Sequence, residues 1–127
     1  MRVVLDSGGV SWLAQRSSRA AAVIEEMRTA GLWPALLPAP VLVECLTGQA
    51  GRDAPANRLL KSCDVVTDLP QALARRCARL RFEARRGSAV DAIVIGIAEP
   101  NGVVLTSDPR DLSALAQVAT KVTIRAV

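Results

Sequence analysis

One stretch, from Ser88 to Leu112, constrains the fold of this chain more strongly than any other. It reads SAVDAIVIGIAEPNGVVLTSDPRDL. Ser88 is typical of a helix N-cap, and residues 92–98 are apolar on nearly every side, which predicts a buried helix rather than an amphipathic one. The residues from Pro100 to Gly102 predict a turn. The uniformly apolar run 103–105 then predicts a short strand that is covered on both faces.

Similar alternation of apolar runs and helical segments extends over the whole chain. Strands are expected at residues 2–5, 32–37, 63–66, 103–105 and 121–125, and a loop at 49–55. Helices are expected around residues 10–13 and at 17–31, 41–47, 56–62, 70–86, 88–98 and 109–117. Short strands that alternate with helices predict a parallel sheet with helices on both faces. With 127 residues, the chain is expected to form a single α/β domain, residues 1–127.

The amino-acid composition limits the classes of function that this chain could have. The chain has no His, which excludes imidazole bases and every Ser-His or Cys-His nucleophile pair. The net charge of +4 and the pI near 9.6 favour an anionic partner, nucleic acid first. Three widely spaced Cys favour reduced thiols over disulfides or zinc. We find no signal sequence and no apolar run of about 18 residues, so a soluble, cytoplasmic protein without membrane contact is expected.

Several acids follow the expected strands or begin helices. Asp6 and Asp108 come directly after strands, Glu44 lies in the helix after the second strand, and Asp91 lies in the first turn of the buried helix. Asp111 follows shortly after Asp108. In an open parallel sheet, ligands bind beyond the carboxyl ends of the strands, where the strand order reverses. If the first and fourth strands are neighbours, these acids can reach one crevice.

Each acid also has a structural interpretation. Asp6 suits a helix N-cap, and both Ser88 with Asp91 and Asp108 with Asp111 resemble capping boxes. Glu44 is unusual because it stands among apolar residues, so it either has a partner or lines a cleft, or it simply points outward. These interpretations account for each acid singly and leave their shared placement unexplained.

Clustered carboxylates repel one another and favour a divalent cation. Because oxygen ligands without His or Cys select a hard ion, the acids predict Mg²⁺ or Mn²⁺. Such an ion can lower the pKa of a water molecule and hold a phosphate oxygen, which suits phosphodiester hydrolysis.

The expected helix 70–86 carries a cluster of arginines. Spacing places Leu73, Cys77, Leu80 and Ala84 on its core face, and Arg75, Arg79 and Arg86 on the opposite face, with Arg76 beside them. This outer face is either a solvated helix face or a surface that contacts phosphates. Since aromatic residues make up only 2% of the chain, base stacking is expected to contribute little.

Together these motifs resemble those of PIN-domain ribonucleases, and among them the VapC-type toxins of toxin–antitoxin pairs. The resemblance spans essentially the whole chain. It rests on VVLDS with Asp6, PVLVECLTG with Glu44, SAVDAIVIGIA with Asp91, and VLTSDPRDL with Asp108 and Asp111. One departure is Gly8, where the family commonly has a small polar residue.

The resemblance implies a five-stranded parallel sheet of order 3-2-1-4-5 and metal-dependent cleavage of RNA. It implies that Asp6, Glu44, Asp91 and Asp108 form the acidic cluster, with Asp111 as a less certain member and Thr106 or Ser107 as a polar helper. It also implies a homodimer that is neutralised by a small antitoxin protein. Candidate contact surfaces surround four residues for which core packing is the alternative explanation, namely Trp12, Ile24, Met27 and Leu42.

Two other classes of protein remain as alternatives. A non-catalytic PIN-like module would use the same fold and the arginine-rich helix to hold RNA or a protein. A phosphoacceptor receiver domain is disfavoured, because receivers carry the phosphorylated Asp after the third strand and pair it with a Lys for which we find no counterpart in this sequence.

Overall fold

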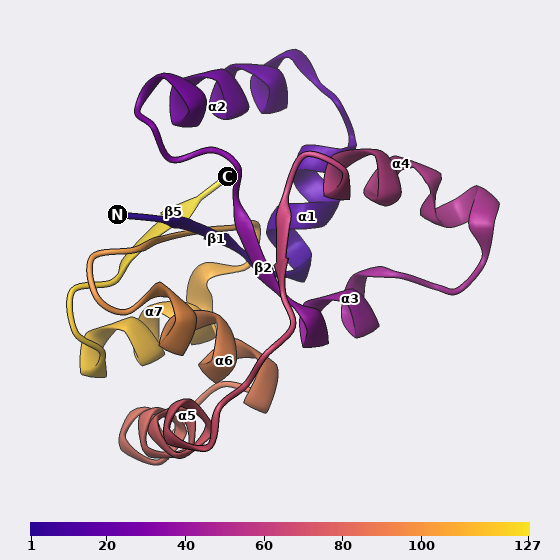
Figure 1. Ribbon diagram of the computed structural model, residues 1–127. Coiled ribbons are helices and arrows are strands. Elements are labelled where there is room, and N and C mark those ends of the chain that lie inside the picture. Colours follow the sequence, from indigo (N-terminus) through magenta and orange to yellow (C-terminus); the bar gives the residue numbers. More distant parts are fainter.

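A five-stranded, all-parallel sheet forms the centre of the molecule (Figure 1). The computed structural model describes all residues from Met1 to Val127. The strands are β1 (Val3–Leu5), β2 (Leu36–Pro38), β3 (Asp64–Val66), β4 (Val103–Thr106) and β5 (Thr123–Ala126). Their order, β3-β2-β1-β4-β5, confirms both the α/β fold class and the 3-2-1-4-5 order that the resemblance implies.

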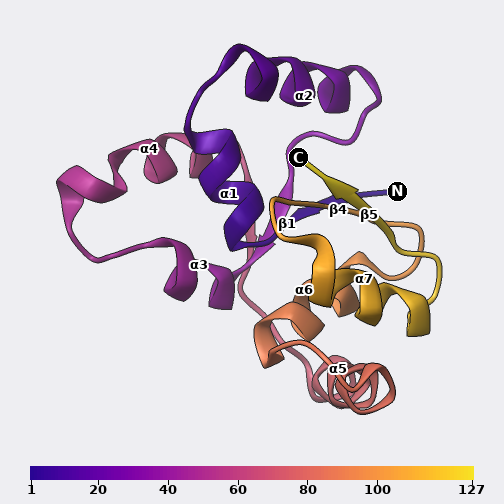
Figure 2. The same cartoon turned by 180° about the vertical axis from the view of Figure 1, so that it is seen from behind.

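Seven helices surround the sheet. They are α1 (Ser7–Ala14), α2 (Ser18–Thr29), α3 (Ala39–Cys45), α4 (Ala50–Leu60), α5 (Gln71–Ala84), α6 (Ala89–Ala98) and α7 (Pro109–Val118). Figures 1 and 2 show α6 and α7 on one side of the sheet, with α5 packed outside them, and α1 with α2 and α4 on the other. None of the helices is both long and apolar enough to cross a membrane.

The core is aliphatic and centres on the two middle strands. Every residue of β1 is fully buried, and so are Val104 to Thr106 of β4. Most residues of α6 are buried as well, which confirms that this helix is enclosed rather than amphipathic. All three cysteines are free thiols; Cys77 is buried, and Cys45 and Cys63 are half-buried against the core.

Two boundaries near the middle of the chain differ from the prediction. The second strand covers only Leu36–Pro38, because its paired register with β1 and β3 begins at Leu36. The loop predicted at 49–55 is wrong, since α4 begins at Ala50 despite Gly51 and Pro55. The buried carboxylate of Asp53 fixes this start: it accepts hydrogen bonds from the Thr47 amide (2.8 Å), the Thr47 hydroxyl (2.8 Å) and the Gly48 amide (2.9 Å).

The arginine-rich helix α5 is shorter than predicted. Arg85 adopts the left-handed conformation with φ of 56° and ends the helix, so Arg86 lies beyond it rather than on its outer face. The predicted core face is confirmed, with Cys77 and Leu80 buried and Leu73 and Ala84 half-buried against the core. Arg75 and Arg79 remain on the exposed face.

Candidate active site

The candidate site lies at the carboxyl ends of β1 and β4. These strands pair in parallel with Leu5 opposite Leu105, so Asp6 and Thr106 follow side by side. The chain leaves β1 towards β2 on one side and returns through β4 on the other, which makes this the point where the strand order reverses. Ligands of open α/β sheets bind at such a point.

Asp6 is the most constrained acid of the site. The residue is 7% exposed. Oδ1 accepts the Gly9 amide at 2.7 Å, which confirms that Asp6 caps α1. Oδ2 accepts the hydroxyl of Thr106 at 2.7 Å, and the same hydroxyl oxygen accepts the Asp108 amide at 3.0 Å. Helix capping therefore accounts for the contact of Oδ1 only. The contact of Oδ2 with Thr106 joins the end of β1 to the end of β4, which are 100 residues apart in the sequence.

The pKa of Asp6 is raised above its ordinary value. Burial is the main cause, and the negative charge of Asp91 acts in the same direction, whereas the hydrogen bonds from Thr106 and Gly9 oppose it. α6 packs against β1, and Asp91 in its first turn is within range of the charge on Asp6. A buried carboxylate with a raised pKa and a second acid nearby is typical of functional sites.

A pair of glycines lets α1 approach β4 closely. A Cβ on Gly9 would lie 2.3 Å from the Leu105 carbonyl oxygen, and a Cβ on Gly8 would lie 2.5 Å from the Ser107 hydroxyl oxygen. The Ser107 hydroxyl can rotate away from a side chain at position 8, whereas the Leu105 carbonyl is part of the backbone, so Gly9 is the residue that the close approach requires. The sequence prediction did not single out Gly9, although a glycine pair directly after a capping Asp is a signal for such an approach.

Asp91 belongs to a capping box, as predicted. It accepts the Ser88 amide at 3.0 Å through Oδ2, and its own amide donates to the Ser88 hydroxyl at 3.0 Å. The carboxylate is half-buried, and Oδ1 makes no hydrogen bond within the chain. The capping role is therefore compatible with a further contact on the free oxygen.

The second capping box, predicted for Asp108 and Asp111, is wrong. Asp108 occupies the N-cap position of α7, but its side chain makes no capping hydrogen bond. Asp111 instead accepts a hydrogen bond from Nε of Arg86 at 3.0 Å, in an ion pair whose side chains are about half exposed. The Asp108 carboxylate is exposed and unpaired beside Thr106, whereas Asp111 and Arg86 neutralise each other.

Glu44 and Ser107 make fewer contacts than the predicted roles would suggest. Glu44 is exposed in α3 and has no ion-pair partner, so its outward-pointing interpretation matches the structure. Ser107 is also exposed, and Thr106 is the hydroxyl residue that contacts Asp6. Figure 2 shows α3 near the beginning of α1, with which it packs.

The chemistry of these donors fits a hard divalent cation. Asp6 keeps one free lone pair on each oxygen, and Asp91, Asp108 and Glu44 have carboxylate oxygens without a partner. As the side chains stand, however, no group of three or more acids is arranged to hold a metal ion. The convergence of all four carboxylates on one ion therefore stays a prediction.

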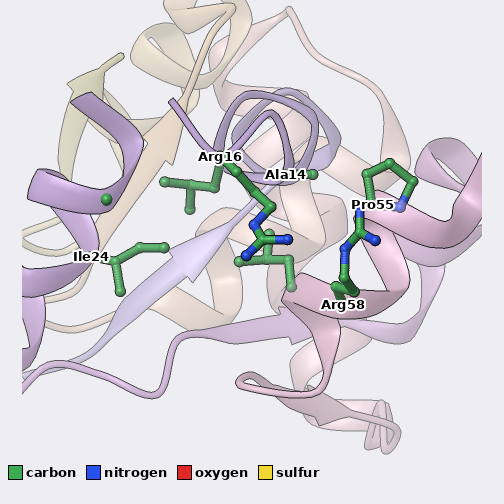
Figure 3. A pocket seen from close by; sticks show the side chains of 8 residues that line it. Ala14, Arg16, Ile24, Pro55 and Arg58 are labelled. Atoms are coloured by element: carbon green, nitrogen blue, oxygen red, sulfur yellow. The ribbon is translucent and has the colours of Figure 1, made fainter. Parts of the chain in front are cut away.

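A separate pocket of about 520 Å³ lies between α1, α2 and α4, at the opposite end of α1 from Asp6. Figure 3 shows Ala14, Ile24 and Pro55 around it, with the side chains of Arg16 and Arg58 beside the same space. Because no carboxylate lines this pocket, it is distinct from the acidic edge of the sheet.

No protein-family model and no curated protein matches this chain. Among solved structures, the crystal structure of PAE2754 from Pyrobaculum aerophilum is similar, with a TM-score of 0.65. The alignment covers 95% of this chain and 92% of PAE2754, at 18% sequence identity. At this identity, the similarity shows a shared fold.

Proposed function

We propose that this protein is a metal-dependent endoribonuclease acting as the toxin of a toxin–antitoxin pair. The observation that carries the proposal is the bond from Thr106 to the buried Asp6, made where β1 and β4 diverge. The nearby charge of Asp91 and the free carboxylate of Asp108 support it further. RNA is proposed as the substrate because of the motif resemblance and the basic net charge of the chain.

The residues have different tasks in this proposal. Asp6, Asp91 and Asp108 would hold a Mg²⁺ or Mn²⁺ ion, with Glu44 reaching it directly or through water. When bound there, such an ion lowers the pKa of a water molecule and offsets charge on the scissile phosphate. Thr106 holds the carboxylate of Asp6 in one orientation.

The test is cleavage of total RNA by the purified protein, followed by sequencing of the products. The proposal expects cuts at a restricted set of sites, loss of activity in EDTA and recovery with Mn²⁺. Asp64→Asn is a matched control, because Asp64 is an exposed acid at the beginning of β3, on the opposite edge of the sheet. Cleavage that persists in both Asp6→Asn and Asp91→Asn would reject the assignment.

The second candidate function, a non-catalytic module that binds RNA, is favoured by the exposed Arg75 and Arg79, which have no acidic partner. A binding module would retain its affinity for RNA in EDTA and would leave the RNA intact with Mn²⁺. The same cleavage assay therefore separates the two functions.

A protein partner and a homodimer are also proposed. The pocket between α1, α2 and α4 offers an apolar surface with Arg16 and Arg58, which suits an acidic, amphipathic segment of an antitoxin. Of the four residues named as contact candidates, Ile24 lines this pocket, Trp12 and Leu42 are half-buried, and Met27 is buried in the core. Molar-mass measurements with and without a co-expressed antitoxin test both expectations, and Ile24→Glu should abolish only the mixed complex.

A further inference from the structure

Helix α5 exposes the one phenylalanine of the chain. Phe82 is 71% exposed, whereas both tryptophans are half-buried. It lies three residues after Arg79 and seven after Arg75, so all three share the outer face of the helix. We call these three residues the α5 stripe.

Some arginines of this segment are paired with acids, and those of the α5 stripe are not. Arg76 is bound by Glu99 through two hydrogen bonds of 3.0 and 2.7 Å, and Arg86 is paired with Asp111. Arg75 and Arg79 have neither a hydrogen bond nor an ion pair and are exposed. The α5 stripe therefore carries two unneutralised guanidinium groups and one aromatic face.

The surface beside the α5 stripe leaves room for a flat ligand. Arg75 and Arg79 line a shallow depression together with Ala72 and Ala78, whose small side chains keep it open. Phe82 is not among the residues that line this depression, but it follows Arg79 by three positions and therefore lies about one helical turn beyond it on the same face. A base placed on this ring would have its phosphates beside the arginines.

We infer that the α5 stripe binds a single-stranded segment of RNA, with Phe82 stacking on a base and Arg75 and Arg79 contacting phosphates. Aromatic side chains combined with cationic ones are the usual means of holding single strands, because every base has a stacking face. A second copy of this chain is the less suitable occupant, since a two-fold interface would bring the same positive groups against each other.

The position of the α5 stripe also suits a substrate contact. Phe82 lies at the C-terminal end of α5, and the short connection through Gly87 and Ser88 leads directly to Asp91. Arg81 donates a 3.4 Å hydrogen bond to the Gly87 carbonyl, and a Cβ on Gly87 would lie 3.6 Å from Cβ of Asp91. A strand bound on the stripe would therefore extend from the acidic edge along α5. The choice of RNA rests on the proposed function, whereas the stacking role of Phe82 does not depend on cleavage.

The experiment measures binding of a fluorescent single-stranded RNA to the full chain by anisotropy, in EDTA and in an Asp6→Asn background so that no RNA is cut. Phe82→Leu should weaken binding about tenfold or more without changing its salt dependence, and Phe82→Trp should restore binding. Arg79→Gln should weaken binding and lower the salt slope by about 0.7. Arg52→Gln, which removes an exposed arginine from α4, should have a smaller effect than Arg79→Gln.

Equal affinity of Phe82→Leu and its parent would overturn the inference, even if the wild-type protein cleaves RNA. The inference would also be overturned if Phe82→Leu changed only the molar mass of the protein or its complex with another protein. Stacking-dependent binding by a wild-type protein that never cleaves RNA would support the inference and reject the nuclease. The two proposals can therefore fail separately.

Discussion

At the scale of single residues, the hydrogen bonds of Asp6 favour its ionised form, whereas its burial disfavours that form. Its carboxylate caps α1 and bonds to Thr106, but burial and the charge of Asp91 make its ionised form unfavourable. Because the folded-state pKa is raised, the stability that Asp6 contributes is fully present below its unfolded pKa and is lost as the pH rises through the folded pKa. At neutral pH, the protein therefore retains a charge that weakens its fold, which is expected of a residue kept for activity.

Asp6→Asn removes this charge and keeps the size of the side chain. We expect cleavage of RNA to fall by at least about 100-fold, since a proposed metal ligand is lost. We also expect the free energy of unfolding at pH 7 to stay the same or to rise by up to about 1 kcal/mol. Thermal melts at pH 4 and pH 7 test this, and the gain should be smaller at the lower pH. A clear loss of stability at pH 7 would show that the capping role dominates.

Thr106 is predicted to position Asp6. Thr106→Val removes the hydroxyl and should lower activity about 10- to 100-fold. In the wild-type protein, the hydrogen bond from Thr106 lowers the pKa of Asp6. Without this bond the pKa of Asp6 should rise, so the acid limb of the pH profile of kcat/KM should move to higher pH. Thr106→Ser should restore the profile. An acid limb that does not move in Thr106→Val would contradict the positioning role.

At the scale of elements, the contact between α1 and β4 sets the geometry of the site. Gly9 has no space for a side chain because the Leu105 carbonyl oxygen is in the way. Gly9→Ala should therefore lower the free energy of unfolding by about 1–3 kcal/mol. Gly51→Ala is the control, since nothing lies within 4 Å of the added Cβ in α4, and a gain of up to about 1 kcal/mol is expected. Denaturant unfolding measures the free energy of unfolding of both variants. Equal changes in Gly9→Ala and Gly51→Ala would contradict the close approach of α1 to β4.

The beginning of α4 depends on Asp53. Hydrogen bonds from the Thr47 amide and hydroxyl and the Gly48 amide hold the pKa of Asp53 below its ordinary value. Its contribution to stability is therefore present above the unfolded pKa and is lost as the pH falls through the folded pKa. Asp53→Ala should lower the denaturant midpoint at pH 7 and differ little from wild type near pH 2. If the denaturant midpoints of Asp53→Ala and wild type differed by the same amount at pH 7 and near pH 2, the proposed role of the Asp53 charge would be rejected.

These elements also show how far the sequence determines the fold. The apolar runs predict all five strands, and the signal is clearest for β1 and β4, because a strand buried on both faces has no polar positions. The edge strands β3 and β5 are largely exposed and rest on shorter apolar runs. Residues 50–55 were misjudged as a loop, since Gly51 and Pro55 are local signals, whereas Asp53 acts through Thr47 and Gly48 earlier in the chain. Local propensity alone does not reveal such a contact.

The site could be predicted only in part for the same reason. Asp6, Asp91 and Asp108 were identifiable from their positions at strand and helix ends, but the bond between Asp6 and Thr106 depends on the pairing of β1 with β4. The exposure of Phe82 was missed, because a low aromatic content says nothing about where an aromatic side chain lies.

At the scale of the whole molecule, the candidate-site acids and the α5 stripe occupy two different regions. The site acids lie at the carboxyl edge of the sheet, while the exposed Arg75 and Arg79 lie on α5, which packs outside α6 and α7 (Figures 1 and 2). A cation at the acidic edge and a polyanion along α5 would complement these regions. The central claim is that acids distant in the sequence share one cation at this edge.

Titration of the protein with Mn²⁺, followed by the electron paramagnetic resonance signal of the free ion, tests this claim most directly. The account predicts a saturable site in the wild-type chain, at least about tenfold weaker binding in Asp6→Asn and in Asp91→Asn, and unchanged binding in Asp64→Asn. No saturable binding by the wild type, or equal affinity in all four proteins, would contradict it.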